Sequence, residues 1–413
     1  MSTNDPDISA SSSRPDITIL TTSFPRFAGD NAGRFVYNFS YALSQSGCTV
    51  QVIAPDDSEV IPQSFPFTVK NFPYFFPRSL QSLAYGAGMA SRIKRNGWRL
   101  LQLPFFVMAF FFAALKSEGK ILHAYWTLAG LVALAVKFFT GKYVVINLWG
   151  SDILFTKIPI LWYCLSKAFN RADAIICESQ DFADQLIAKG LTRQRITVLP
   201  NGLDLQQFKP MDQISQRKQL GLPTDRPLLL SVGNLSERKG HKYLLQALSK
   251  ILQSYGPVLV VIVGEGEFRS SIEATIADLK LENSVHLAGF QKGETIANWL
   301  NAADIFILPS LLEGTPNILL EAMACQLAVV STRVGGVGHV IEDGTNGCLV
   351  QPKSEIEIAD TVVSLLQDPD LCQQLGKNAR ETIYSKYGSW KEQSLKLKNL
   401  YAKILVNTTR SIF

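Results

Sequence analysis

The most constraining feature of the sequence is a regular alternation of short apolar runs with stretches of helical length. Runs such as Thr49–Pro55 (TVQVIAP) and Val258–Gly264 (VLVVIVG) are rich in β-branched residues and almost continuously apolar. Parallel strands have this composition because helices bury them on both faces. The alternation therefore predicts an α/β fold in which helices cover parallel, doubly wound sheets.

The runs fall into two series. In the first, helices are expected at Arg34–Ser46 and Thr127–Phe139, and strands at Asp16–Phe24, Thr49–Pro55, Ile121–Trp126, Tyr143–Trp149, Ala174–Ser179 and Ile196–Pro200. The second series follows Pro200-Asn201-Gly202 and a polar stretch, 204–225, that is typical of a linker. Its expected strands are Pro227–Asn234, Val258–Gly264, Val285–Gly289, Ile305–Pro309, Val329–Thr332 and Cys348–Val350. Its expected helices are Lys239–Tyr255, Phe268–Leu281, Glu294–Ala302, Ile318–Cys325 and Glu355–Gln367.

The length of 413 residues fits two domains of this kind, at about 150 residues or more each. We expect an N-terminal domain at 16–203 and a C-terminal domain at 204–385. Sheets of this class bind ligands outside the carboxyl ends of their strands, so a site in a cleft between the domains is expected. Residues 1–15 are polar and predict a disordered tail, whereas 386–413 predict a C-terminal helix that can pack back on the N-terminal domain.

Positive charge is concentrated in the first half of the chain. Residues 1–200 hold 19 basic and 13 acidic side chains, a net charge of +6, whereas 201–413 hold 21 and 22, a net charge of −1. The segment 60–117 has no acidic residue and contains ten of the 24 phenylalanines. Its basic residues are Lys70, Arg78, Arg92, Lys94, Arg95, Arg99 and Lys116. A basic and aromatic surface of this kind fits an anionic membrane better than a nucleic acid, because long apolar runs separate the basic residues.

The longest uncharged apolar run is Leu103–Leu115 (LPFFVMAFFFAAL). Its 13 residues are too few to span a bilayer, which takes about 20. Two interpretations stay open: a core helix, or a helix that lies in the membrane interface with Arg92, Lys94, Arg95 and Arg99 on lipid headgroups.

The cysteines and the N-terminus indicate a cytoplasmic protein, which the membrane interpretation would place at the inner face of the cell membrane. The six cysteines form no CxxC motif or close pair, as expected of reduced thiols. The first residues, MSTNDPDISASSSRPD, lack the charged and then apolar pattern of a signal peptide.

The most informative segment for chemistry is Leu308–Gly336. It predicts a strand that ends at Pro309, a loop with Glu313-Gly314-Thr315-Pro316-Asn317, and a helix from about Ile318. Proline is tolerated in a first helical turn, and the free N–H groups of a helix start bind phosphate oxygens well. Glu313 precedes the helix and Glu321 lies one turn inside it, so two carboxylates are expected to reach different depths of one pocket.

A second loop, Gly233–Gly240 (GNLSERKG), also follows a strand and precedes a helix. Arg238 and Lys239 would bring two cations to the same pocket, where arginine can hold a phosphate bidentately and lysine acts as a point charge. The alternative is a solvated turn with two surface cations.

No metal site is expected from the sequence. The two Asp-x-Asp matches lie in the tail (Asp5-Pro6-Asp7) and after a C-terminal helix (Asp368-Pro369-Asp370), where aspartate is typical of turns and caps. The four histidines are dispersed along the sequence. His123, at the end of an expected strand, would either touch an acceptor or be a satisfied structural histidine, and Asp152 is a candidate general base.

These segments together resemble the retaining nucleotide-sugar glycosyltransferases of glycosyltransferase family 4, or group 1, whose GT-B fold has two Rossmann-like domains that face each other across a cleft. The resemblance rests on EGTPNILLEAMA, which looks like the family's Glu-x7-Glu block, on SVGNLSERKG and on ITVLPNGLDLQQF. Gly264-Glu265-Gly266 is similar to a further glycine turn. In the first half, the stretches around Gly33-Arg34-Phe35 and Trp149-Gly150-Ser151-Asp152 look like the family's acceptor-side loops.

The resemblance implies transfer of a sugar from a nucleotide diphosphate sugar to a glycan or lipid-linked hydroxyl, with retention and without a metal or other cofactor. Cell-surface polysaccharide or glycolipid synthesis is the implied setting. Glu313, Lys239 and Arg238 would be catalytic. The implied donor-binding residues are Asn234, Gly264, Gly314, Thr315, Pro316, Asn317, Ile318 and Glu321, and the implied acceptor-side residues are Gly33, Arg34, His123, Trp149 and Asp152. Fixed cations and a helix start would stabilise the charge of the departing diphosphate.

Several positions depart from the family's pattern. Trp149 stands where the family often has a histidine near the donor sugar, and Asn234 where it often has an arginine. Gln326-Leu327-Ala328 replaces a usual glycine and proline, and His339 a usual glutamate. Local loop changes are expected here, with Gly335-Gly336 still forming a close turn beneath the diphosphate.

Two other classes of function are considered. An NAD-dependent oxidoreductase is disfavoured, because no GxGxxG motif joins the first strand to its helix. A non-catalytic sugar-nucleotide-binding protein of the same fold remains an alternative, which Trp149 and Asn234 make conceivable.

Overall fold

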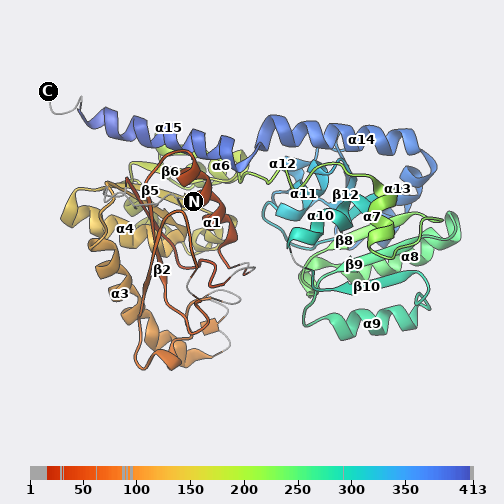
Figure 1. Ribbon diagram of the computed structural model, residues 1–413, viewed down its shortest axis with the longest axis horizontal. Coiled ribbons are helices and arrows are strands. Elements are labelled where there is room, and N and C mark those ends of the chain that lie inside the picture. The colour runs from red at the N-terminus through yellow and green to blue at the C-terminus, as the bar shows by residue number, and fades with distance from the viewer. Residues whose placement is uncertain are drawn as a thin grey trace, which may run out of the picture. The chain divides into compact units, whose positions relative to one another are not determined.

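The structure is a computed structural model that describes residues 16–27, 30, 32–61, 63–85, 89, 92–93, 96–291 and 293–409. The expected disordered tail, residues 1–15, lies outside the described residues. Two compact units divide the chain. Unit 1 comprises 1–177, 183–199 and 394–413, and unit 2 comprises 178–182 and 200–393 (Figure 1).

Unit 1 contains a seven-stranded sheet in the order β3-β2-β1-β4-β5-β6-β7, with every neighbouring pair parallel. Its strands are β1 (Ile17–Leu20), β2 (Val50–Pro55), β3 (Thr68–Phe72), β4 (Ile121–Tyr125), β5 (Tyr143–Leu148), β6 (Ala174–Cys177) and β7 (Ile196–Val198). Its α-helices are α1 (Arg34–Gln45), α3 (Leu103–Leu115), α4 (Trp126–Thr140) and α5 (Pro159–Phe169), together with most of α6 (Gln180–Ala188) and α15 (Trp390–Thr409), whose first residues fall in unit 2. Shorter helical turns are η1 (Arg78–Leu80), η2 (Gly97–Gln102), η3 (Gly150–Lys157) and η4 (Arg193–Arg195).

Unit 2 contains a six-stranded parallel sheet in the order β10-β9-β8-β11-β12-β13. Its strands are β8 (Leu228–Val232), β9 (Leu259–Val263), β10 (Val285–Gly289), β11 (Ile305–Leu308), β12 (Ala328–Thr332) and β13 (Cys348–Val350). Its α-helices are α7 (Gln213–Gln219), α8 (His241–Ser254), α9 (Arg269–Asp278), α10 (Gly293–Ala302), α11 (Asn317–Ala324), α12 (Val337–Val340), α13 (Glu355–Gln367) and α14 (Pro369–Thr382). The turns η5 (Glu237–Lys239) and η6 (Ile383–Tyr387) complete the unit.

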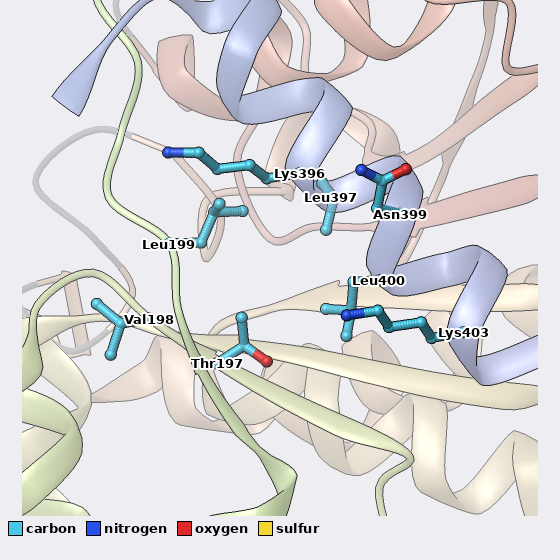
Figure 2. A pocket seen from close by; sticks show the side chains of 8 residues that line it. All are labelled: Thr197, Val198, Leu199, Lys396, Leu397, Asn399, Leu400 and Lys403. Carbon is cyan, nitrogen blue, oxygen red and sulfur yellow. The ribbon is translucent and has the colours of Figure 1, made fainter. Parts of the chain in front are cut away.

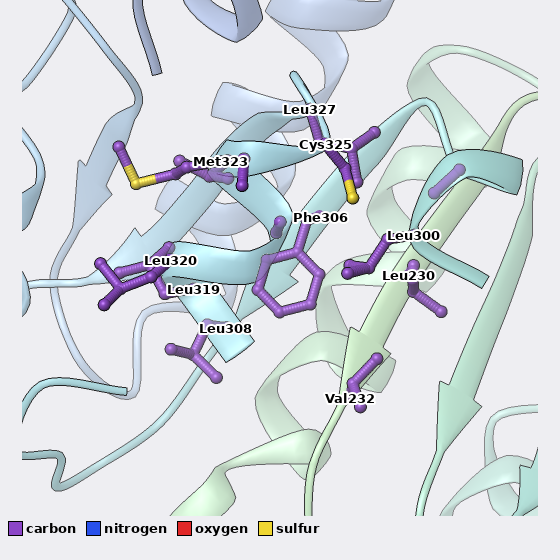
Figure 3. Packing of buried hydrophobic residues seen from close by; sticks show 14 of the residues in the cluster. Leu230, Val232, Leu300, Phe306, Leu308, Leu319, Leu320, Met323, Cys325 and Leu327 are labelled. Atoms are coloured by element: carbon purple, nitrogen blue, oxygen red, sulfur yellow. The ribbon is translucent and has the colours of Figure 1, made fainter. Parts of the chain in front are cut away.

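The sheet of unit 2 is buried on both faces, as the continuous apolar runs predict. Leu230, Phe306 and their neighbours pack on α10, α11, α12 and α14, and Figure 3 shows the Phe306 ring among leucines of this cluster. Alternate strand residues such as Leu229 and Ile307 pack on α8, α9 and α13. The two doubly wound sheets therefore confirm the α/β prediction.

The linker expected near 201–225 is wrong, because this stretch belongs to unit 2 and most of it is folded there. The helix α7 lies within it, and the Arg217 guanidinium forms an ion pair with Asp304 at 2.6 Å and donates to the carbonyl of Ala302 at 2.8 Å. The chain passes into unit 2 at 199–200 and returns at 394, so that part of α15 belongs to unit 1. The polar composition that suggested a linker reflects a surface helix.

Segment Gly97–Leu115, which joins η2 to α3, is longer than the apolar run in the sequence. It is a helical segment of 19 residues, and an 18-residue stretch of it has mean hydropathy 1.7 and is 22% buried. Among the described residues it is the one helix long and apolar enough to cross a membrane by length and composition. Phe106 and Phe110 of α3 are buried against Phe72 of β3, with ring centroids 5.3 and 4.8 Å apart respectively.

Candidate functional site

Two of the catalytic residues predicted from the sequence, Lys239 and Glu313, meet at the switch point of the sheet in unit 2. Strands β8 and β11 are neighbours there, and their connections run in opposite directions across the sheet. Lys239 follows β8 and Glu313 follows β11, and the lysine Nζ lies 2.6 Å from the glutamate Oε1. Ser310 Oγ donates to the same oxygen at 2.7 Å. Ligands of doubly wound sheets bind at this position, so the pair marks the candidate site.

The Lys239–Glu313 pair is largely withdrawn from solvent, with side-chain exposures of 13% and 7%. A buried charge is stable only when it is paired and hydrogen-bonded, and each member of this pair meets that condition through the other. The ammonium group has three N–H donors, so the bond to Glu313 leaves two for an anionic ligand. Ser310 also belongs to the site, although no motif or spacing in the sequence marks it.

The two loops of the pair are fixed by a close backbone approach at Gly240. This residue has φ +66, and a Cβ added to it would lie 2.0 Å from the carbonyl oxygen of Pro309. The backbone N–H of Leu311 also donates to the carbonyl of Arg238 at 2.7 Å. Only glycine combines this left-handed conformation with this approach, so Gly240 ends η5 and fixes the distance between the β8 and β11 loops.

A third loop, after β12, packs beneath the second. Gly335 has φ +50, and a Cβ there would lie 1.8 Å from the carbonyl oxygen of Glu313. The N–H of Gly336 donates to the carbonyl of Gly314 at 3.1 Å. The close turn expected at Gly335-Gly336 is present and packs against the Glu313 loop, whereas its place beneath a diphosphate stays a prediction.

Gly264 plays a comparable packing role after β9. It has φ +148, and a Cβ would lie 2.0 Å from the carbonyl oxygen of Gly233. Its N–H donates to the carbonyl of Gly289 at 2.9 Å. The close approach of the neighbouring loop's backbone therefore explains why a glycine is needed at position 264. Its contact with a donor stays a prediction.

Helix α11 begins at Asn317, directly after Pro316, one residue before the expected start. Its first-turn N–H groups have no acceptor within the helix, as at any helix start. Thr315 is partly exposed, Asn317 is exposed, and the Asn317 Oδ1 accepts from the Asn201 amide at 3.5 Å. Gly314, Thr315, Asn317 and Ile318 therefore lie where the first turn of α11 can receive an anion.

Glu321 lies one turn inside α11 and is partly exposed. Its carboxylate forms no hydrogen bond or ion pair with any residue in the described part of the chain. Burial raises its pKa from the ordinary 4.5 to about 7. A desolvated carboxylate without a protein partner is available for a ligand hydroxyl, as the resemblance implies.

Arg238 and Asn234 are exposed on the β8 loop. The Arg238 guanidinium has no hydrogen-bond or ion-pair partner among the described residues. Their roles at a donor stay predictions, and the structure brings only Lys239 of this loop into contact with Glu313.

On unit 1, Gly33 and Arg34 form the start of α1. Gly33 has φ +61, and a Cβ would lie 2.2 Å from the carbonyl oxygen of Ser23, so α1 begins tightly against the end of β1. Arg34 is exposed, with its guanidinium 5.1 Å from the centre of the Tyr37 ring. This cation–π contact orients Arg34 without neutralising it.

Asp152 is a positioning residue in this structure. Its Oδ2 accepts from the N–H of Trp149 at 2.9 Å, and its Oδ1 accepts from the N–H and hydroxyl of Thr127 at 3.1 and 2.8 Å. Burial raises the pKa of this carboxyl. Both oxygens join the loop after β5 to the start of α4, which disfavours the expected role as general base for an acceptor.

His123 is buried in β4, and its predicted contact with an acceptor is therefore wrong. The ring has no exposed surface, and its Nδ1 lies 2.7 Å from the hydroxyl of Tyr401 on α15. Burial lowers the pKa of His123 to about 3, so the ring is neutral at physiological pH. The structural alternative fits: His123 ties the C-terminal helix to the sheet of unit 1.

Trp149 belongs to an aromatic cluster at the carboxyl edge of the unit 1 sheet. Its ring centre lies 4.3 Å from that of Phe35, which in turn lies 5.4 Å from that of Trp126 and 5.9 Å from that of Tyr125. The Trp149 Nε1 is buried and finds no acceptor among the described residues. Phe35 lies in a stretch that the resemblance places on the acceptor side, but the sequence does not indicate that its ring meets those of Trp126 and Trp149.

Across the described residues, no group of three or more histidine, cysteine, aspartate or glutamate side chains could hold a metal ion. The six cysteines are free thiols. A pocket of about 310 Å³ lies between β7 and α15 on unit 1, lined by residues such as Leu199, Leu397 and Lys403 (Figure 2). It contains none of the predicted site residues.

The two parallel sheets define a GT-B protein, and solved structures agree. Sucrose-phosphate synthase from Thermosynechococcus elongatus superposes with a TM-score of 0.79 at 22% identity, over 95% of this chain and 100% of that one. Anabaena HepE, solved in complex with UDP, gives a TM-score of 0.74 at 21% identity, over 94% and 100%.

Sequence comparison identifies the family. Residues 212–382 match the model of glycosyl transferases group 1, and 32–207 match that of glycosyltransferase family 4. Alpha-D-kanosaminyltransferase of Streptomyces kanamyceticus is 30% identical over 263 residues, 62% of this chain and 67% of that protein. An uncharacterized glycosyltransferase of Methanocaldococcus jannaschii, MJ1607, is 32% identical over 211 residues, 50% of this chain and 54% of its own length. The chain belongs to the group 1 glycosyltransferases.

Proposed function

We propose that the protein transfers a sugar from a nucleoside diphosphate sugar to a hydroxyl of a glycan or a lipid-linked acceptor. The observation that carries this proposal is the buried Lys239–Glu313 pair at the switch point of unit 2, next to the start of α11. Structures of Anabaena HepE contain UDP or UDP-glucose, which supports a nucleotide sugar as the co-substrate. A cytoplasmic role in the synthesis of cell-surface polysaccharide or glycolipid is part of the proposal.

The chemistry follows from the charges at the site. Cleavage of the bond between the anomeric carbon and the diphosphate oxygen leaves its electron pair on the diphosphate. The acceptor oxygen forms the new bond to the anomeric carbon and gives up its proton, which the departing diphosphate oxygen takes. Lys239 can place two N–H donors on that developing charge while its third stays on Glu313. The first-turn N–H groups of α11 add fixed dipoles. These groups supply the stabilisation that a divalent cation gives elsewhere, so transfer is expected to be independent of metal.

Retention of the anomeric configuration is likewise proposed. Glu313 lies at the carboxyl end of β11, where the donor sugar would reach it, and Glu321 lies one turn deeper for the ribose hydroxyls. Because Ser310 and Lys239 hold the same Glu313 oxygen, the carboxylate is fixed in orientation. Nuclear magnetic resonance of the product linkage tests this point, and an inverted product would contradict it.

The first test is a panel of nucleotide sugars screened by thermal shift, followed by release of free nucleotide from those that bind. A ligand that binds only the folded state raises Tm, by an amount set by its concentration relative to Kd. Lys239→Ala should lower turnover by at least about 100-fold, as removal of a donor to developing charge does elsewhere. Lys242→Ala removes an exposed lysine from the adjacent turn of α8 and should leave turnover unchanged.

The outcome separates the two candidate functions. Binding without release of nucleotide, with or without acceptor, would support a non-catalytic sugar-nucleotide-binding protein. Neither binding nor release across the panel would reject both. Unchanged turnover in the presence of a chelator is expected, and complete loss that added Mg²⁺ restores would refute the metal-independent mechanism.

A further inference from the structure

Unit 1 carries an apolar surface that its own fold leaves uncovered. On the segment that joins η2 to α3, Leu101, Phe105, Met108 and Phe112 are between 52% and 69% exposed. Their spacing of four, three and four residues places them along one side of the helix. At the end of α4, Phe138 and Phe139 are 85% and 69% exposed. These six residues are called the apolar face.

Aromatic contacts make the apolar face continuous from α3 to α4. The ring centre of Phe111 lies 5.5 Å from that of Phe112 and 5.8 Å from that of Phe139. Phe138 and Phe139 lie 5.2 Å apart. Soluble monomers rarely expose a contiguous apolar surface of this kind unless it meets a membrane or a partner.

The opposite side of α3 fixes how the helix can meet a membrane. Phe106, Phe110 and Ala114 are fully buried; Phe110 stacks on Phe72 of the sheet, and Phe106 meets the same ring edge-to-face. If the helix crossed a bilayer, these residues would leave the core of unit 1. The helix is therefore held on one side by protein and exposed on the other, which is the geometry of a helix lying in a membrane interface.

The charge around the apolar face is basic. From 60 to 117 the sequence has no acidic residue, and Lys116 and Lys120 are exposed just after α3, with Glu118 between them. Lys142 follows α4 and donates to Ser117 Oγ at 3.0 Å. Lysines at the edge of an apolar helix can bury their stems and place their charge at the headgroups.

The structure shows what two residues of the expected basic set contact within the protein. Arg92 Nη1 donates to the carbonyl of Ser82 at 2.8 Å, and the Arg99 side chain donates to the Ser82 hydroxyl and the carbonyl of Arg92 at 3.2 and 3.1 Å. These two arginines hold the loop before α3 and are partly buried, so the protein itself uses part of each guanidinium's donor set. Lys94 and Arg95 lie outside the described residues.

We infer that the apolar face docks on the surface of an anionic lipid bilayer, with α3 lying along the interface. A second copy of the chain is the less suitable occupant, because a two-fold contact would bring the same lysines together. One consequence of this docking depends on the proposed function: the enzyme would meet its acceptor at the membrane. Lipid binding itself requires no donor or acceptor.

The test is co-sedimentation of the full chain with vesicles of phosphatidylcholine, with or without phosphatidylglycerol. Binding is expected with the anionic vesicles, and it should fall at least about tenfold between about 0.05 M and about 1 M salt as charge is screened. The triple variant Phe105→Ser, Met108→Ser, Phe112→Ser should lose binding at low salt. Ile356→Ser, which removes a 52% exposed side chain from α13 of unit 2, should bind as the wild type does.

A second measurement locates the contact. Trp98 in η2 is 39% exposed, so brominated lipids should quench its fluorescence when the protein binds. The Trp98→Phe variant should show less quenching than the wild type. Thermal unfolding and nucleotide release by the triple variant should match those of the wild type, which shows that the fold and the donor site are intact.

Three results would overturn the inference: equal binding by the triple variant, absence of binding to anionic vesicles at low salt, or retention in membranes after alkaline carbonate, which indicates a spanning helix. None of these results bears on nucleotide-sugar turnover, so the inference and the proposed function can fail separately.

Discussion

Substitution of Gly335 by alanine tests whether the loop contact beneath Glu313 controls activity. A Cβ at this position would lie 1.8 Å from the carbonyl oxygen of Glu313, whereas such contacts are essentially never below 3.0 Å. The Glu313 loop and the Gly335 turn must therefore separate by about 1.2 Å or more. Because Lys239 and Ser310 hold the Glu313 carboxylate at 2.6 and 2.7 Å, this movement breaks at least one of the two bonds.

The expected loss follows from the size of the movement. A misplacement of about 1 Å in a positioned group can cost about 100-fold in rate, so kcat/KM of Gly335→Ala should fall by about that factor. The left-handed φ adds a cost of about 1–2 kcal/mol to the free energy of unfolding for a residue with a Cβ. The assay is nucleotide release with the donor that the thermal-shift panel identifies, together with urea unfolding.

Gly344→Ala is the matched control. Gly344 has φ +73, similar to that of Gly335, but no heavy atom lies within 4 Å of its added Cβ. It should lose about 1–2 kcal/mol of stability and keep its turnover, because only the backbone strain is shared. Near wild-type kcat/KM in Gly335→Ala, or an equal loss in Gly344→Ala, would refute the reasoning.

Three further substitutions test other contacts. Glu321→Gln should be more stable than the wild type at high pH. The folded carboxyl of Glu321 has a pKa of about 7 against the ordinary 4.5, so the wild type loses up to about 3 kcal/mol of stability as pH rises from about 4.5 to 7. Urea unfolding of both proteins at pH 5 and 8 measures the difference in their free energies of unfolding. A constant difference between the two pH values would contradict this. Tyr401→Phe should cost about 1–3 kcal/mol of stability, because it leaves buried His123 without its partner, and should leave nucleotide release unchanged. Asp152→Asn should weaken the bond to the Trp149 N–H and lower stability by about 1–2 kcal/mol. If Asp152 were instead the general base, Asp152→Asn would remove a titrating group from the pH profile of transfer. It would then lower acceptor-dependent transfer by about 100-fold or more and leave stability unchanged.

The sequence predicts the strands of both units well because parallel strands buried on both faces are continuous apolar runs. Ile305–Pro309 and Cys348–Val350, for example, match β11 and β13 to within one residue. The strand β3 (Thr68–Phe72) was missed because it lies at the sheet edge and includes exposed Lys70 and Asn71. An edge strand lacks the pattern that identifies its neighbours.

The candidate site was predictable in part for a related reason. Lys239 and Glu313 are 74 residues apart, but each follows a strand, and the switch point of a doubly wound sheet brings such loops together. The bond from Ser310 and the pairing of His123 with Tyr401, 278 residues away, depend on side-chain packing that no periodicity encodes. Arg92 and Arg99 are a further example: the sequence shows their charge, but it does not predict which backbone carbonyls they bind.

The return of the chain at residue 394 has a consequence for how the protein is made. Apart from 178–182, unit 2 is a continuous stretch from 200 to 393, whereas unit 1 needs residues from both ends of the chain. Entry and exit of unit 2 are paired, since the N–H of Leu203 donates to the carbonyl of Gly388 at 3.1 Å and the N–H of Trp390 to the carbonyl of Leu203 at 3.3 Å. During synthesis, the first unit to emerge from the ribosome is therefore the last to be completed, because Leu397, Tyr401 and Ile404 of its core are translated after all of unit 2.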